Sequence, residues 1–64
     1  MNAYMVIKVM RDGTHKAEFL NERNDLEGYL MGLRSIDRSY ILFEWSALNR
    51  AYVQVIAWDA EGVV

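Results

Sequence analysis

The chain has 64 residues, a formal net charge of −2, one histidine and no cysteine. This length forms one domain, and folding at this size buries only about 60% of the surface that the unfolded chain exposes. Disulfides and a zinc site with cysteine ligands are excluded as stabilising elements. Because the hydrophobic content of 53% is slightly above the usual range for soluble domains, we expect a second copy or another protein to complete the core.

Charge and hydropathy exclude two classes of partner. The Lys and Arg side chains, 7 in all, are scattered singly and form no basic stripe that could follow a phosphate backbone, so we expect no binding to duplex nucleic acid. The first residues lack the basic region and apolar run of a signal peptide, and no apolar stretch reaches the roughly 18 residues of a membrane span. We therefore expect a cytoplasmic protein without membrane contact.

The strongest local signal is a β-hairpin at the beginning of the chain. Residues 4–11 are mostly apolar or β-prone, and Asp12-Gly13 follows them. Asp-Gly is favoured in two-residue hairpin turns because both central positions need positive φ. The pattern predicts that Arg11 pairs with Thr14 across such a turn.

A helix follows the first hairpin. Apolar residues recur there at i, i+3, i+4 and i+7, and they are Leu26, Tyr29, Leu30 and Leu33. This spacing gathers them into one stripe that can lie on a sheet. Asn24, followed three residues later by Glu27, has the form of a helix-start cap. The pattern predicts a helix from about Asp25 to Arg34.

Residues 39–46 and 51–59 predict a second hairpin with apolar side chains on both faces. The turn is expected around Leu48-Asn49, because asparagine tolerates the left-handed conformation of a tight turn. With Ala47 opposite Arg50, one side of this hairpin is aromatic and the other is aliphatic. One helix can cover only one of these sides, so the other side predicts a surface for association.

We expect the aromatic side to face the helix, because Glu44 lies on the other side and a short helix needs large side chains beneath it. The sheet residues of this expected core are Tyr4, Val6, Met10, Ala17, Phe19, Ile41, Phe43, Trp45, Tyr52, Ile56 and Trp58. The aliphatic side is then the predicted interface with a second copy or a partner. Its residues are Met5, Ile7, Val9, Tyr40, Leu42, Val53, Val55 and Ala57.

The element order predicts an α+β fold of the type ββαββ, with a four-stranded mixed sheet and one helix packed on one face. The first and fourth strands are the most apolar, so the expected strand order is 2-1-4-3 with a parallel central pair. This layout resembles a reduced β-grasp and is similar in element order to the immunoglobulin-binding domains of protein G, a likeness that implies no binding residues. We expect residues 1–64 to be a single domain and residues 60–64 to be a frayed tail.

Side chains suited to catalysis are sparse. The single histidine, His15, follows the Asp12-Gly13 turn and is expected to be an ordinary strand residue, and no glycine-rich phosphate loop follows a strand. Asp12 and Asp37 could meet at one end of the sheet, but two carboxylates without a third ligand make a weak metal site. We expect no enzymatic activity, no cofactor and no bound metal.

These features favour a small, non-catalytic protein-binding module that homodimerises through the aliphatic face. Its size suits an accessory factor or inhibitor from a phage or mobile element. Two alternatives stay open. The aromatic strand residues could stack the bases of a single-stranded nucleic acid, or the chain could be a small subunit of a larger enzyme.

Overall fold

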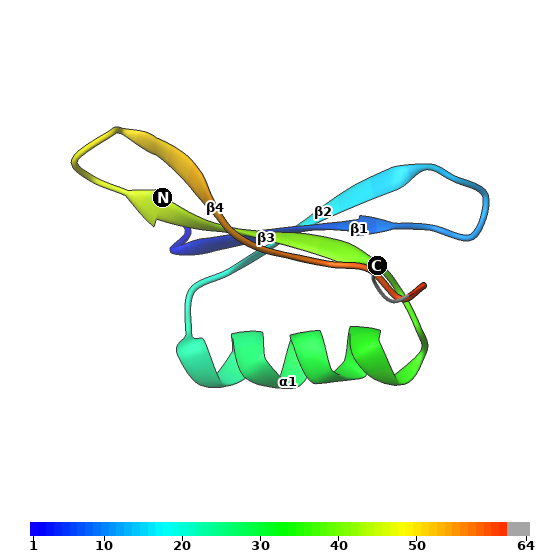
Figure 1. The fold of residues 1–64 in the computed structure, drawn as a ribbon. Helices are drawn as coiled ribbons and strands as arrows, with labels where there is room; N and C mark the ends of the chain where they lie inside the picture. The colour runs from blue at the N-terminus through cyan, green and yellow to red at the C-terminus, as the bar shows by residue number, and fades with distance from the viewer. Residues whose placement is uncertain (62–64) are drawn as a thin grey trace.

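The computed structural model describes residues 1–61. Its elements are β1 (Tyr4–Val9), β2 (His15–Leu20), α1 (Arg23–Ser35), β3 (Tyr40–Ser46) and β4 (Ala51–Trp58). The four strands form one sheet, and α1 runs along one face of it (Figure 1). The predicted α+β class and ββαββ element order are confirmed.

The strand order is β2-β1-β3-β4, and every neighbouring pair is antiparallel. The predicted order 2-1-4-3 with a parallel central pair is wrong, because β3 and not β4 lies beside β1. Backbone hydrogen bonds extend this central ladder past both strand ends, from Val9 N to Ser39 O at 3.0 Å and from Trp45 N to Ala3 O at 2.8 Å. The chain therefore shares the element order of a β-grasp but not its strand order or its parallel central pair.

The chain reverses between β1 and β2 through a three-residue loop, residues 11–13. Met10 N donates to Thr14 O at 2.7 Å, and Gly13 N donates to Met10 O at 2.9 Å. Gly13 has a φ of 89°, which suits the left-handed last position of this loop. The predicted two-residue turn is one residue too short. Every β2 side chain therefore faces the opposite side of the sheet from the predicted one.

The helix begins earlier than predicted but buries the predicted stripe. Its N-cap is Glu22, which makes no side-chain capping bond, and Asn24 lies inside the first turn. Arg23 and Glu27 form an exposed ion pair at 3.8 Å one turn apart. The stripe is confirmed as the face that packs on the sheet, because Leu26 and Leu33 are buried and Tyr29 and Leu30 pack against the core.

The helix ends in a left-handed residue. Asp37 N donates to Arg34 O at 3.0 Å and Arg38 N donates to Leu33 O at 2.9 Å, the two bonds of a Schellman motif. Asp37 has a φ of 54°, in the region that glycine favours. The motif turns the chain abruptly from α1 into β3.

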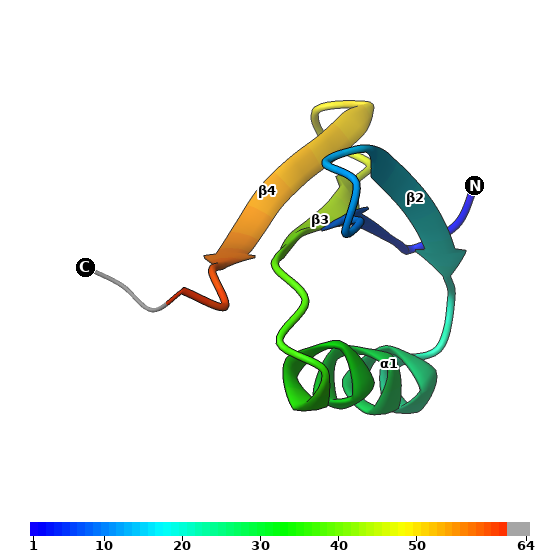
Figure 2. The ribbon, with the colours of Figure 1, turned by 90° about the vertical axis from the view of Figure 1, so that its right-hand side faces the viewer.

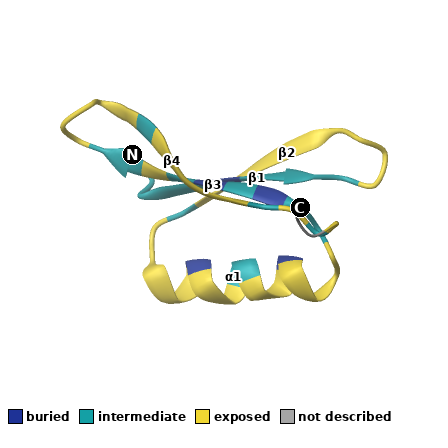
Figure 3. Ribbon diagram, viewed as in Figure 1, coloured by how far each residue is buried: buried dark blue, intermediate teal, exposed yellow. Residues whose placement is uncertain are grey.

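The core lies between α1 and the two central strands. Its buried side chains are Val6, Leu26, Leu33, Tyr40 and Leu42, and the half-buried side chains packed against them are Tyr4, Leu20, Tyr29, Leu30 and Trp58. In Figure 3 the buried positions are confined to the side of α1 that faces the sheet and to the middle of the sheet. The small number of fully buried side chains agrees with the limited burial expected for a chain of this length.

The second hairpin matches the predicted register near its turn and departs from it further along. Trp45 pairs with Tyr52 as predicted, but a β-bulge between Leu42 and Phe43 leaves Val55 as an extra residue on β4. The left-handed turn residue is Arg50, with a φ of 52°, and not the asparagine before it. A bulge increases the local twist and bends the strand that carries it.

The sheet is strongly twisted. Both hairpin tips rise on the side away from α1 (Figure 1), and the C-terminal ends of β2 and β4 descend toward the α1 side (Figure 2). Diagonally opposite corners of the sheet thus bend in the same direction.

The predicted frayed tail lies largely outside the described residues, since residues 62–64 are not among them. The two tail residues that are described form hydrogen bonds. Ala60 N donates to Ser39 Oγ at 3.0 Å, and Glu61 N donates to Asp59 Oδ1 at 2.9 Å.

Candidate interaction surface

The charged side chains of the strands all lie on the α1 side of the sheet. Lys8 Nζ donates to the Tyr29 hydroxyl at 2.7 Å, which places Lys8 on this side. Lys16 is the direct cross-strand partner of Lys8. Glu18 pairs with Val6 and Glu44 pairs with Tyr4. Because directly paired residues share a face and these two β1 residues face the helix, both glutamates lie on the α1 side. Strand β4 contains no charged residue.

The opposite side of the sheet, here called the open face, carries the alternate strand residues. They are Met5, Ile7, Val9, His15, Ala17, Phe19, Ile41, Phe43, Trp45, Tyr52, Gln54 and Ala57. Within residues 1–61 the only layer packed on the sheet is α1, so nothing covers this face (Figure 2). Strand spacing and rise give it a footprint of about 400 Å². This extent is comparable to the largest apolar patch on a typical monomeric protein, and such patches are often functional.

An aromatic cluster occupies one end of the open face. The Trp45 and Tyr52 rings meet edge to face at 5.2 Å, and the Phe19 and Tyr52 rings are 6.1 Å apart. The Tyr52 hydroxyl donates to Asn2 O at 2.9 Å, which fixes the central ring of the cluster. Rings held in place before binding lose little conformational entropy in a complex.

A shallow cavity of about 360 Å³ lies at the other end of the sheet, and its lining combines open-face residues with the α1-side residues Tyr40 and Trp58. Aliphatic side chains contribute much of its wall, and His15 and Asp59 add polar groups. The complete lining is Ile7, Val9, His15, Ser39, Tyr40, Ile41, Ala57, Trp58 and Asp59. The open face therefore offers an aromatic ridge and an aliphatic hollow to a docking surface.

The residues of the predicted interface do not all lie together. Four of them lie on the open face, because they alternate along their strands with core residues: Met5, Ile7, Val9 and Ala57. Val53 and Val55 are 43% and 50% exposed on edge strand β4, and Val53 pairs with Glu44 on the α1 side.

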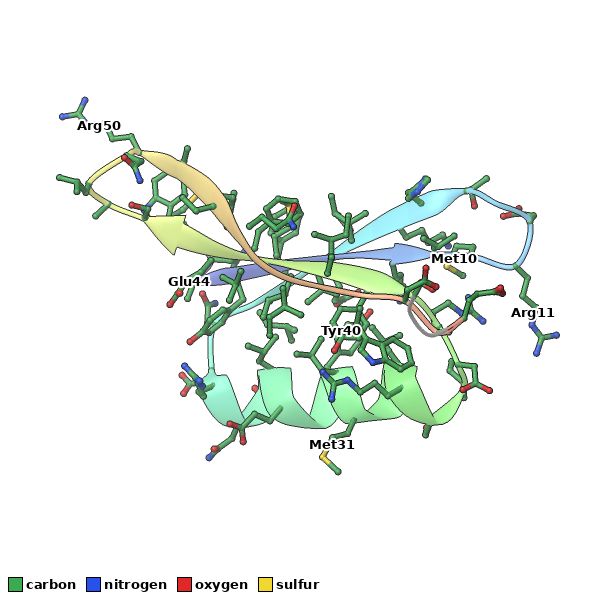
Figure 4. The ribbon with its side chains drawn as sticks, in the orientation of Figure 1. Met10, Arg11, Met31, Tyr40, Glu44 and Arg50 are labelled. Carbon is green, nitrogen blue, oxygen red and sulfur yellow. The ribbon has the colours of Figure 1, made fainter. Side chains whose placement is uncertain are left out.

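Tyr40 and Leu42 correct that prediction. They are 1% and 6% exposed and pack beneath α1, so no partner could reach them. Figure 4 shows Tyr40 between the sheet and the helix. Of the predicted sheet core, Ala17, Phe19, Ile41, Phe43, Trp45 and Tyr52 instead lie on the open face, while Met10 adjoins the first turn and Ile56 is 43% exposed.

In β3 and at the turn end of β4 the two faces were exchanged, because the prediction relied on Glu44 and on aromatic content. Glu44 does lie on the α1 side, but near one end of the sheet, where it stays exposed (Figure 4). Aromatic content could not decide between the faces, because Tyr40 and Trp58 stack at 5.7 Å on the α1 side. Alternation places Lys8 and Glu44 on the same face as the buried residues Val6 and Leu42, but this pattern does not show in advance which face the helix covers.

Groups suited to covalent chemistry do not converge on this surface. In residues 1–61, no three His, Cys, Asp or Glu side chains come together as metal ligands.

Hydrogen bonds from the Thr14 hydroxyl at 2.6 Å and the Thr14 N–H at 3.0 Å hold the pKa of Asp12 below its ordinary value. The helix in the described part of the chain is too short and too polar to cross a membrane.

No protein-family model matches this chain, and no curated protein or solved structure is significantly similar to it.

Proposed function

We propose that the protein is a non-catalytic, cytoplasmic binding module that homodimerises by packing the open face of one copy against the open face of another. The sorting of charge supports this proposal. Every charged strand residue lies on the α1 side, and the open face has none. Burial of unpaired charges is costly, so an uncharged apolar face is the one that a partner can cover.

A second copy suits this face better than an unrelated surface. In a two-fold symmetric interface, residue i of one copy contacts residue j of the other and j contacts i, so only side chains at the axis meet their own counterparts, and like charges there would repel. The open face has no charged strand residue to cause that repulsion. Twisted sheets pack face to face with their strands within about 30° of each other, and a second copy has the same twist. Such a dimer would be a two-sheet sandwich with a helix on each outer side.

The sheet edges are less suited to association. Strand β2 has Lys16 and Glu18, and charged residues on an edge discourage pairing with another strand. Strand β4 has no charge, but its bulge at Val55 interrupts the regular ladder that another strand would need. These features favour contact through the face over contact through an edge.

Sedimentation equilibrium tests the proposal directly. The wild-type chain is expected to sediment as a species of twice 7.5 kDa at micromolar concentration. Phe43→Lys puts a charge at the centre of the open face, between Met5 and Gln54, and should shift the protein to monomer. Val53→Lys is the matched control, because it adds the same charge to an exposed residue beside Glu44 on the other face, and should remain dimeric.

A wild-type chain that sediments at 7.5 kDa at every concentration would overturn the proposal. So would dissociation by Val53→Lys to the same extent as by Phe43→Lys. If Phe43→Lys unfolds, Gln54→Lys replaces it, because this residue is already polar and lies beside Phe43 on the open face. Circular dichroism of each variant separates loss of dimer from loss of fold.

The aromatic cluster favours one other candidate function. Exposed rings on a sheet stack the bases of single-stranded nucleic acids in several protein classes. Such binding also uses Lys or Arg along the strand path, and the open face has neither. Fluorescence anisotropy of a labelled oligothymidine separates the two functions. Binding that weakens steeply with salt would favour the nucleic-acid function, and unchanged anisotropy would count against it.

A further inference from the structure

A second cavity, of about 350 Å³, lies at the β1–β2 turn, away from the aromatic cluster. Its lining is Met10, Arg11, Asp12, Thr14, Lys16 and Arg38. The three cationic side chains come from separate segments: the turn, strand β2 and the link between α1 and β3. Figure 4 shows Met10 and Arg11 at this end of the sheet and Arg50 at the other hairpin tip. The fold thus brings three of the chain's seven Lys and Arg residues to one site.

In the described part of the chain, none of these three cations forms an ion pair with a carboxylate within 4.0 Å. The one ion pair within 4.0 Å among residues 1–61 joins Arg23 to Glu27, on the first turns of α1. Asp12 lines the cavity, but its Oδ1 already accepts the Thr14 hydroxyl and N–H. These bonds lower the pKa of Asp12, which is ionised at neutral pH, so the lining residues Arg11, Lys16, Arg38 and Asp12 together carry an excess of two positive charges, while Asp37 and Glu61 line an adjoining hollow.

A like-charge pair adjoins the cavity. Lys8 and Lys16 are direct partners across the β1–β2 ladder. Like charges at directly opposite positions destabilise a sheet. The Lys8 amine turns to the Tyr29 hydroxyl, which carries no opposite charge. An anion bound beside Lys16 would offset this repulsion.

Arg38 is held in place before any ligand arrives. It is the residue after the left-handed Asp37, and its own N–H bonds to Leu33 O at 2.9 Å. Its side chain is half-buried, and Nη1 lies 3.5 Å from the Met10 sulfur. A guanidinium that is already ordered loses less conformational entropy on binding an oxyanion.

We propose that this cavity binds a phosphate group, either as the free ion or as the phosphate of a small molecule. A phosphate dianion matches the excess charge of two, whereas one carboxylate would match half of it. The planar guanidinium of Arg38 can donate two parallel N–H bonds to phosphate oxygens, and Lys16 and Arg11 supply charge from the other sides. The volume is in the range of sites for small molecules.

The test is an NMR titration of the 15N-labelled full chain with sodium phosphate at about pH 7.5, where phosphate is largely dianionic. Sodium chloride keeps the ionic strength constant. Amide signals of residues 11–14 and the Arg38 side-chain signal should shift and saturate. Arg38→Gln and Lys16→Gln should each weaken binding by about tenfold, as expected for loss of a charge-assisted hydrogen bond. Arg50→Gln, the same charge change at the other hairpin tip, should leave binding unchanged.

Shifts that do not saturate, or equal weakening by Arg50→Gln, would overturn the proposal. If Arg38→Gln alters the fold, the exposed Lys16→Gln decides the outcome. A parallel titration with adenosine monophosphate separates the two sources of phosphate. Tighter binding than inorganic phosphate supports a nucleotide-sized ligand, and equal binding supports the free ion. This site is independent of the open face, so failure of either proposal leaves the other standing.

Discussion

Lys8 donates a hydrogen bond from Nζ to the hydroxyl of Tyr29 at 2.7 Å, and so joins the central strand β1 to the middle of α1. This contact lies on the same face of the sheet as the buried residues Val6 and Leu42. Because strand side chains alternate, Met5, Ile7 and Val9 point away from the helix and lie on the open face. The half-buried charge of Lys8 therefore lies under the helix, and the open face on the other side of the sheet has no charged strand residue.

Tyr29→Phe should destabilise the fold by about 1–2 kcal/mol, because it removes the acceptor of a half-buried ammonium group. Lys8→Met should cost less, since it removes the charge together with its need for an acceptor. In the double variant the effects should be clearly non-additive. Urea denaturation of the four proteins measures this coupling. Additive losses would mean that the hydrogen bond contributes nothing to stability.

Sequence alone predicted the features that depend on local pattern. The α1 stripe of Leu26, Tyr29, Leu30 and Leu33 follows from helical spacing, and the first hairpin follows from Asp12-Gly13. The register of that hairpin did not follow, because Asp-Gly also fits a three-residue loop with its glycine left-handed at the last position. One added loop residue reverses the side of every residue in β2.

The interface was the harder prediction because it required a choice between two apolar faces. Alternation correctly separated Tyr40 and Leu42 from Ile41 and Phe43, but it cannot tell which set lies under the helix. Long-range contacts such as Lys8 to Tyr29 make that choice, and no local pattern encodes them. The bulge at Val55 likewise arises only when β3 and β4 pair.

Asp37→Gly should stabilise the protein by about 0.5 kcal/mol. The left-handed conformation costs a residue with a Cβ about 1 kcal/mol, and the added freedom of glycine in the unfolded chain offsets part of the gain. Gly13→Ala is the opposite control and should destabilise, because Gly13 has a φ of 89°. Thermal unfolding monitored by circular dichroism measures both. A less stable Asp37→Gly variant would show that the Asp37 side chain itself supports the turn.

Thr14→Val should raise the pKa of Asp12 toward its ordinary value, because the Thr14 hydroxyl is the main group that lowers it. A carboxyl whose folded-state pKa is depressed contributes stability above its unfolded-state pKa and loses it as pH falls through the folded-state value. In the variant the Asp12 carboxyl should therefore contribute less stability at neutral pH, and the loss of that contribution should be complete at a higher pH than in the wild type. A 13C NMR titration of the Asp12 carboxyl measures the shift, and Thr14→Ser, which keeps the donor, should preserve the low value. An unchanged pKa in Thr14→Val would assign the effect to the backbone N–H.

The two tryptophans report on opposite faces of the sheet. Trp58 stacks on Tyr40 at 5.7 Å on the α1 side, and the Arg34 guanidinium carbon lies 5.6 Å from the Trp58 ring centroid. Trp45 contacts Tyr52 on the open face, where homodimerisation would cover it. Trp58→Phe and Trp45→Phe therefore give proteins with one reporter each.

Acrylamide quenching of these two variants, measured across a dilution series, should separate the faces. Quenching of Trp45 should increase on dilution as dimers dissociate, while quenching of Trp58, which packs against the core on the α1 side, should change much less. Equal increases at both residues would mean that dilution unfolds the chain and that no folded monomer exists. Constant quenching of Trp45, with sedimentation still showing a dimer, would move the interface off the open face and onto a sheet edge. The two residues thus test the position of the interface without placing a charge in it.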